Sequence, residues 1–154
     1  MPQKSKTIVV TRTMAHTVEG QLVLVVHGEP PPTDDEWLGY LDTLKMLLEK
    51  GPIEQLIMTT GGGPNVTQRK MLNEAIRGRP NRVAVSTGST MVRGMVTAIS
   101  WFNPQIAAFA PDQLAHAFDY LSVPREKVPM LMASVRELHN RLGSNNSSQF
   151  GQLA

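Results

Sequence analysis

Glycines and hydroxyl side chains gather in two short segments that each follow an apolar run. The first segment, TTGGGPN at 59 to 65, follows IEQLIM, and the second, STGST at 86 to 90, follows RVAV. Hydroxyl groups beside glycine amides at the start of a helix can hold an anion, form an oxyanion site or carry a phosphoryl group. The candidate residues for anion binding or phosphorylation are Thr60, Gly61, Gly62, Gly63, Asn65 and Ser89.

The glycine spacing matches neither of the common nucleotide-binding patterns. A phosphate-binding loop would end in Gly-Lys-Ser/Thr, and this sequence has no such ending after its glycines. The dinucleotide fingerprint lacks its third glycine and its later carboxylate. A tight strand-to-helix turn that needs positive φ at glycine explains the same residues structurally. The turn and the ligand site both stay open at this point.

The charges are unevenly distributed along the chain. Residues 34 to 54 are mainly acidic, whereas residues 66 to 105 contain a single acidic residue, Glu74, and the basic residues Arg69, Lys70, Arg77, Arg79, Arg82 and Arg93. Such runs are commonly solvated faces, and the alternative is a contact with an anion or an acidic partner. Arg69 and Arg93 lie nearest the glycine loops and are therefore candidate contacts for a protein partner. The formal net charge of +2 is too small to indicate nucleic-acid binding.

Metal and thiol chemistry have no support in the residue pattern. The four histidines at 16, 27, 116 and 139 lack the i, i+4 spacing of metal ligands, and the chain has no cysteine. We therefore expect no metal and no cofactor. A structural, hydrogen-bonded histidine is the favoured interpretation for His27 and His116.

Length and composition indicate one globular domain. The chain has 154 residues, of which 41% are hydrophobic and 18% are charged. No apolar run approaches the roughly 18 residues that a membrane-spanning helix needs, and the N-terminal residues lack the apolar region of a signal peptide. A cytoplasmic protein without a membrane partner is the resulting expectation.

The order of elements predicts the fold class. Apolar, β-branched runs at 6–12, 21–28, 53–60, 82–86 and 105–110 indicate five strands, and helical patterns follow the last four. Thr33 and Glu36 have capping-box spacing, as do Asn65 and Gln68. Alternating strands and helices predict a single α/β domain with a mixed, mostly parallel five-stranded sheet. The first strand is expected to be the antiparallel neighbour of the second.

The C-terminal part of the chain contains a last helix and a polar tail. The domain is expected to span residues 1 to 142, and the polar residues 143 to 154 predict a disordered tail. In the last helix, Val128, Leu131, Val135, Leu138 and Leu142 are spaced by threes and fours, as in a coiled-coil seam. Packing of this seam on the chain's own sheet is one interpretation. A homodimer through Leu131, Val135 and Leu138 is the other.

An extra first strand, four strand-helix units and a C-terminal helix resemble the STAS fold of the anti-sigma-factor antagonists. In that family the third strand ends in a turn whose serine is phosphorylated by a partner kinase. Here the corresponding stretch is MTTGGGPN, and Thr60 before Gly61 stands in the place of that serine. The resemblance implies a non-catalytic regulatory or protein-interaction module, with a kinase or regulator as partner.

A second resemblance, to serine peptidases of Clp or crotonase-like topology, implies catalysis. The glycines of TTGGGPN would supply oxyanion amides, Ser89 would be the nucleophile and His116 the base. This hydrolase is the alternative to the interaction module. For the module, Gly62→Val is expected to weaken partner binding while largely preserving the fold.

Overall fold

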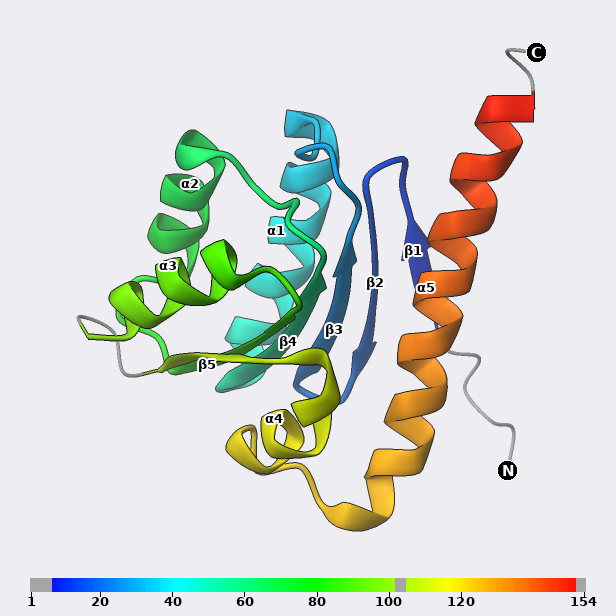
Figure 1. Cartoon of the computed structure of the whole chain (residues 1–154). Helices are drawn as coiled ribbons and strands as arrows, with labels where there is room; N and C mark the ends of the chain where they lie inside the picture. Colours follow the sequence, from blue (N-terminus) through cyan, green and yellow to red (C-terminus); the bar gives the residue numbers. More distant parts are fainter. Residues whose placement is uncertain (1–6, 102–104, 152–154) are drawn as a thin grey trace.

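The computed structural model describes residues 7 to 101 and 105 to 151, with the side chains of 144 to 151 left out (Figure 1). Its strands are β1 (Ile8–Val10), β2 (Met14–Glu19), β3 (Leu22–His27), β4 (Ile53–Thr59), β5 (Asn81–Thr87) and β6 (Ile106–Phe109). Its helices are α1 (Asp34–Lys50), α2 (Val66–Ile76), α3 (Thr90–Ser100), α4 (Leu114–Tyr120) and α5 (Val128–Gly151). Two short 3-10 turns, η1 (Pro111–Gln113) and η2 (Arg125–Lys127), precede α4 and α5.

The strands form one mixed sheet in the order β1-β2-β3-β4-β5-β6. Strand β2 pairs antiparallel with both of its neighbours, β1 and β3, whereas β3, β4, β5 and β6 run parallel. The predicted single α/β domain with a mostly parallel sheet is confirmed.

The sheet differs from the prediction in one strand. It has six strands because Met14–Glu19 is a strand that the sequence did not reveal. Its first four residues are all buried, so it lacks the alternation of buried and exposed residues that marks a half-exposed strand. The neighbour of β3 is consequently β2, and the expected pairing of the first strand with β3 is wrong.

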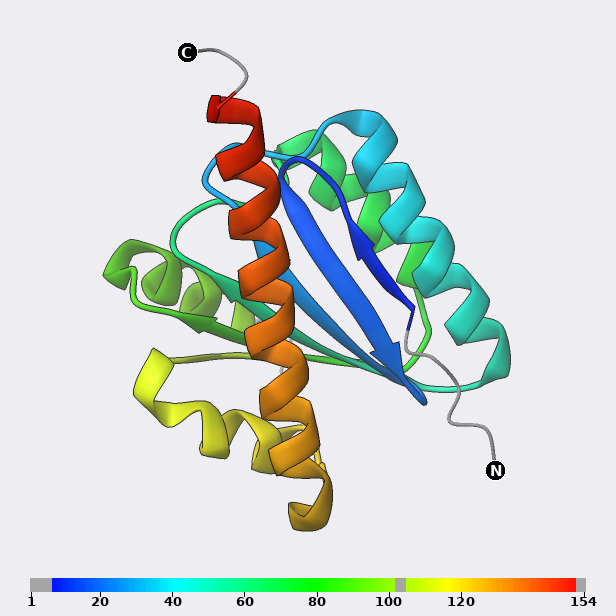
Figure 2. The same ribbon diagram turned by 90° about the vertical axis from the view of Figure 1, so that its right-hand side faces the viewer.

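Helices cover both faces of the sheet. Val23 and Val25 point toward α1, and the partly buried Ile57 joins their cluster to the one that α3 forms with Val83 and Val85. The alternate residues Leu24 and Val26 pack instead against α4 and α5. Helices α1, α2 and α3 thus lie on one face, and α4 and α5 lie on the other (Figures 1 and 2).

The last helix packs against its own sheet. Leu131 and Leu138 are fully buried and Val135 is 6% exposed, in a cluster that includes Leu24 and Leu56. The seam residues therefore belong to the core, and the expected homodimer through Leu131, Val135 and Leu138 is wrong because these side chains are already covered. Figure 2 shows α5 lying across the front of the sheet.

Helix α5 also extends further than expected. It continues to Gly151, so residues 143 to 151 are helical rather than a disordered tail, and residues 152 to 154 lie outside the described part. The polar residues here lack proline, and serine and asparagine each disfavour a helix by less than about 1 kcal/mol. None of the described helices is long and apolar enough to cross a membrane.

The predicted cap of α1 is confirmed, and it also joins the helix to the first strands. The hydroxyl of Thr33 accepts a hydrogen bond from the backbone N–H of Glu36, and the Glu36 carboxylate accepts one from the backbone N–H of Thr33. The same carboxylate accepts hydrogen bonds from the hydroxyls of Thr11 and Thr13 and from the Thr13 backbone N–H. Burial alone raises the pKa of Glu36, but these hydrogen bonds outweigh it and lower the pKa to about 2.

Glu36→Gln is expected to lower the free energy of unfolding by about 1 kcal/mol at neutral pH, a value discounted because the carboxylate is partly open to solvent. The folded-state pKa lies below the usual 4.5, so the stabilisation is present above pH 4.5 and is lost as the pH falls toward about 2. Urea unfolding at neutral and acidic pH measures both effects. Asp35→Asn, in the same helical turn, is the control, and an equal loss in that variant would contradict the assignment.

Candidate functional site

The carboxyl ends of the parallel strands bring three polar residues into register. His27 is paired with Thr59 on β4, and Thr59 is paired with Thr87 on β5. Beyond them the chain turns into α2 and α3, at the edge where ligands commonly bind in open α/β sheets. We call this edge, with the loops 60–65 and 88–89, the rim.

Thr59 and Thr87 hold the two rim loops by the same type of hydrogen bond, from a backbone N–H two residues later to the threonine hydroxyl. The Thr59 hydroxyl accepts a hydrogen bond from the Gly61 N–H at 3.0 Å and donates one to the carbonyl of Gly62. The Thr87 hydroxyl accepts one from the Ser89 N–H at 3.1 Å. Both threonines are buried, so their hydroxyls hold the loops in shape rather than facing a ligand.

Gly62 lies against a neighbouring loop. A Cβ atom at this position would be 1.9 Å from the carbonyl oxygen of Gly28 and 2.6 Å from that of Glu29. Gly61 and Gly63 have φ values of +148° and +157°, which favour glycine. The glycines are therefore required by the turn and by the close approach of two backbones. The expectation that Gly62→Val would largely preserve the fold is wrong.

The remaining candidates of the rim divide into caps and an exposed hydroxyl. The side chain of Asn65 accepts a hydrogen bond from the Gln68 N–H at 2.8 Å and caps α2, as predicted. The Ser89 hydroxyl accepts one from the Val92 N–H at 3.2 Å and caps α3. Thr60 stands between the anchored Thr59 and Gly61 and is exposed. Of these residues, Thr60 is the exposed hydroxyl, and its two neighbours in the chain, Thr59 and Gly61, are held by hydrogen bonds.

A buried glutamine of α2 holds the loop that precedes α1 against α2. Gln68 donates hydrogen bonds to the carbonyl of Pro32 and to the carboxylate of Asp34 at 2.8 and 3.1 Å. Its own carbonyl accepts a hydrogen bond from the indole of Trp37 at 2.8 Å. The sequence indicated the capping role of Gln68, because the capping-box spacing to Asn65 is local. It did not indicate the contacts of Gln68 with Pro32, Asp34 and Trp37, which lie more than thirty positions away.

The two predicted arginines differ in their surroundings. Arg69 of α2 is half-buried, and its Nη1 lies 3.6 Å from the sulfur of Met95 on α3. Arg93 is half-buried in the first turn of α3. Ser86, the first residue of the STGST segment, is buried on the other face of the sheet together with Ala84 and Met58.

The proposed serine and histidine of a hydrolase do not meet. Ser89 starts α3 on one face of the sheet, whereas His116 is exposed on α4, which covers the opposite face. A catalytic pair requires the nucleophile and the base within hydrogen-bond reach of each other. The peptidase resemblance therefore fails in its geometry.

His16 and His27 are buried beneath α1. They are 4% and 6% exposed, and their rings lie near Tyr40 and Trp37 respectively. Desolvation by burial lowers the pKa of each to about 4, so both are neutral at pH 7. The Nδ1 atoms of both histidines lack a hydrogen-bond partner among the described residues. His27 was expected to be a hydrogen-bonded structural histidine, and its burial is found without a bond at this atom. Among the residues with described positions, no cluster of three or more acidic or histidine side chains could hold a metal ion.

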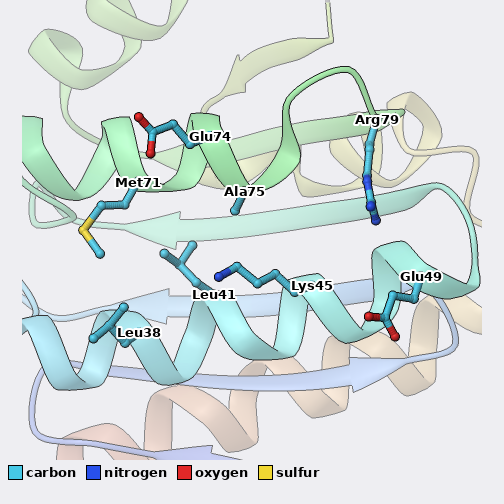
Figure 3. A pocket seen from close by; sticks show the side chains of 8 residues that line it. All are labelled: Leu38, Leu41, Lys45, Glu49, Met71, Glu74, Ala75 and Arg79. Atoms are coloured by element: carbon cyan, nitrogen blue, oxygen red, sulfur yellow. The ribbon is translucent and has the colours of Figure 1, made fainter.

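An open groove lies between α1 and α2, away from the rim (Figure 3). Its volume is about 520 Å³, and it is lined by Leu38, Leu41, Lys45, Glu49, Met71, Glu74, Ala75 and Arg79. The charged side chains along it include two of each sign, so it has no preference for an anion or a cation. The helix patterns did not indicate this groove.

The sequence matches no protein-family model and no curated protein. Among solved structures, the chain is similar to an uncharacterized protein of the DUF3478 family from Shewanella loihica PV-4, described as having a SpoIIAA-like fold. The sequence identity is 18% and the TM-score is 0.55, over 79% of this chain and 98% of that chain. This likeness shows the fold: the chain has a SpoIIAA-like, STAS-type fold, as the sequence resemblance implied.

Proposed function

We propose that the chain is a non-catalytic, cytoplasmic signalling module that binds a regulatory protein through the rim and is switched by phosphorylation of Thr60. The observation that carries this proposal is the exposure of Thr60 between two anchored residues, Thr59 and Gly61. A loop held by the hydrogen bonds of Thr59 and carrying the exposed Thr60 hydroxyl would offer a partner kinase a defined acceptor. A partner that binds this loop would lose little free energy to ordering it, because the loop already has a defined conformation.

The charges at the helix ends support a phosphoryl group near this loop. The first turn of α1 contains three acidic residues, whereas the first turns of α2 and α3 contain none. The free amides at a helix N-terminus favour negative charge. Transfer of the γ-phosphoryl group of a nucleoside triphosphate to Thr60 Oγ1 would add about two negative charges shortly before α2. The added charge would attract or repel the partner at the rim.

Site-specific photo-crosslinking in the native host tests the partner surface. With p-benzoylphenylalanine in place of Thr60, we expect a covalent adduct with one defined protein. The same residue in place of Met46, which is 63% exposed on α1, is the matched control and should give no such adduct. Adducts of equal yield at both positions, or none at position 60 in the folded protein, would contradict a partner at the rim.

A further inference from the structure

Helix α3 is apolar on the side that faces solvent as well as on the side that packs. Val92 and Val96 contact the sheet, while Met91 and Met95 are 83% and 45% exposed. Ile99 is 38% exposed, and Trp101, directly after the helix, is 79% exposed. A helix that is hydrophobic on all sides is normally covered. We call Met91, Met95, Ile99 and Trp101 the α3 patch.

The charges around the α3 patch are positive. Arg93 is the one charged residue of α3, and Arg69 reaches across from α2 to the sulfur of Met95. Helix α2 adds the exposed Lys70 and has Glu74 as its one acidic residue, which lines the groove toward α1. Asp112 on η1 is the next acidic residue along the chain after Glu74. The α3 patch is thus an apolar surface with cations along its edges.

Helix α1 provides the internal comparison. It also exposes apolar side chains, Leu38 at 43% and Met46 at 63%, but its exposed acids outnumber its exposed lysines. The exposed acids include Asp35, Asp42 and Glu49, and the exposed lysines are Lys45 and Lys50. Both helices therefore have exposed methionines, and the balance of charge distinguishes them, because α1 is acidic overall and the charged residue of α3 is Arg93. A ligand that combines apolar and anionic groups fits α3 and not α1.

We propose that the α3 patch docks the protein on the surface of a bilayer that contains anionic phospholipids. Methionine and tryptophan side chains would enter the boundary between headgroups and acyl chains, where tryptophan is favoured, and Arg69 and Arg93 would contact the phosphates. A second copy fits the patch less well, because pairing two patches would bring cations of like sign together. The proposal goes beyond the signalling role and does not depend on Thr60. A spanning segment is not needed, because surface binding uses one helix face.

Vesicle binding tests the proposal with the full chain at low ionic strength. We expect the protein to co-sediment with vesicles of phosphatidylglycerol mixed with phosphatidylcholine, to bind pure phosphatidylcholine weakly, and to dissociate as salt is raised. The emission of Trp101 should shift to shorter wavelength on binding. Trp37 is 1% exposed and should contribute no shift, so the change reports on the α3 patch.

Paired substitutions locate the contact. Met91→Ser and Trp101→Ser should each weaken binding to the anionic vesicles by about tenfold, and Arg69→Glu by a similar factor. Met46→Ser, the same change at an exposed methionine of α1, should leave binding unchanged. Each variant is first shown to unfold at the wild-type temperature.

Three results would overturn the proposal. The first is no binding to anionic vesicles at low salt. The second is an equal loss of binding in Met46→Ser. The third is a shift of Trp101 emission that grows with protein concentration without vesicles and accompanies a dimer in analytical ultracentrifugation, because a second copy would then cover the patch.

Discussion

Gly62→Ala is expected to destabilise the protein by about 3 kcal/mol, because the added Cβ would overlap the backbone of the loop before α1. A Cβ atom at position 62 would lie 1.9 Å from the carbonyl oxygen of Gly28 and 2.9 Å from the carbonyl carbon of Glu29. These are backbone atoms, which cannot rotate away as the end of a flexible side chain can. One of the two loops must move. Urea unfolding followed by the fluorescence of the buried Trp37 measures the loss.

Gly39→Ala is the matched control for this prediction. Gly39 lies within α1, and a Cβ there would meet no atom within 4 Å. Alanine is favoured over glycine in a helix, so this variant should be more stable by up to about 1 kcal/mol. A Gly62→Ala protein as stable as the wild type would show that the two loops are not in contact.

The second large effect is a loss of stability in mild acid. His16 and His27 have folded-state pKa values lowered by burial from 6.5 to about 4. The unfolded chain therefore binds protons first as the pH falls, and folding stability present above pH 6.5 is lost progressively toward pH 4. Between about pH 7 and about pH 5 the two histidines together should reduce the free energy of unfolding by on the order of 3 kcal/mol.

Urea unfolding across this pH range measures the loss, and histidine NMR resonances give the individual pKa values. His27→Gln should reduce the pH dependence of stability between pH 7 and pH 5 by about half. A free energy of unfolding that stays constant over this range, or resonances of His16 and His27 that titrate near the usual 6.5, would contradict their burial.

The local features of the fold could be read from the sequence. Thr33 with Glu36 and Asn65 with Gln68 predicted the starts of α1 and α2, because a capping box involves residues only three positions apart. The apolar runs of β3, β4 and β5 predicted the parallel centre of the sheet. The spacing of Leu131, Val135 and Leu138 predicted a narrow buried stripe but left open what would cover it, because only the tertiary structure places α5 on the sheet.

The features that the sequence did not predict depend on contacts between residues far apart in the chain. Strand β2 is buried along its first four residues, so its pattern resembles neither a half-exposed strand nor a helix. The glycine run correctly indicated a special turn, but nothing near Gly62 in the sequence shows that residues 28 and 29 lie against it. The pairing of Ser89 with His116 failed for the same reason, since the sequence does not show which face of the sheet each helix covers.

The central claim is that the rim presents Thr60 as a phosphorylated switch. The intact mass of the protein from its native host, before and after phosphatase treatment, with peptide mapping of residues 53 to 90, tests it most directly. We predict a removable phosphate on Thr60 and none on the exposed Thr67 of α2. An unmodified chain under conditions in which the partner is bound, or a phosphate confined to another residue, would contradict the claim.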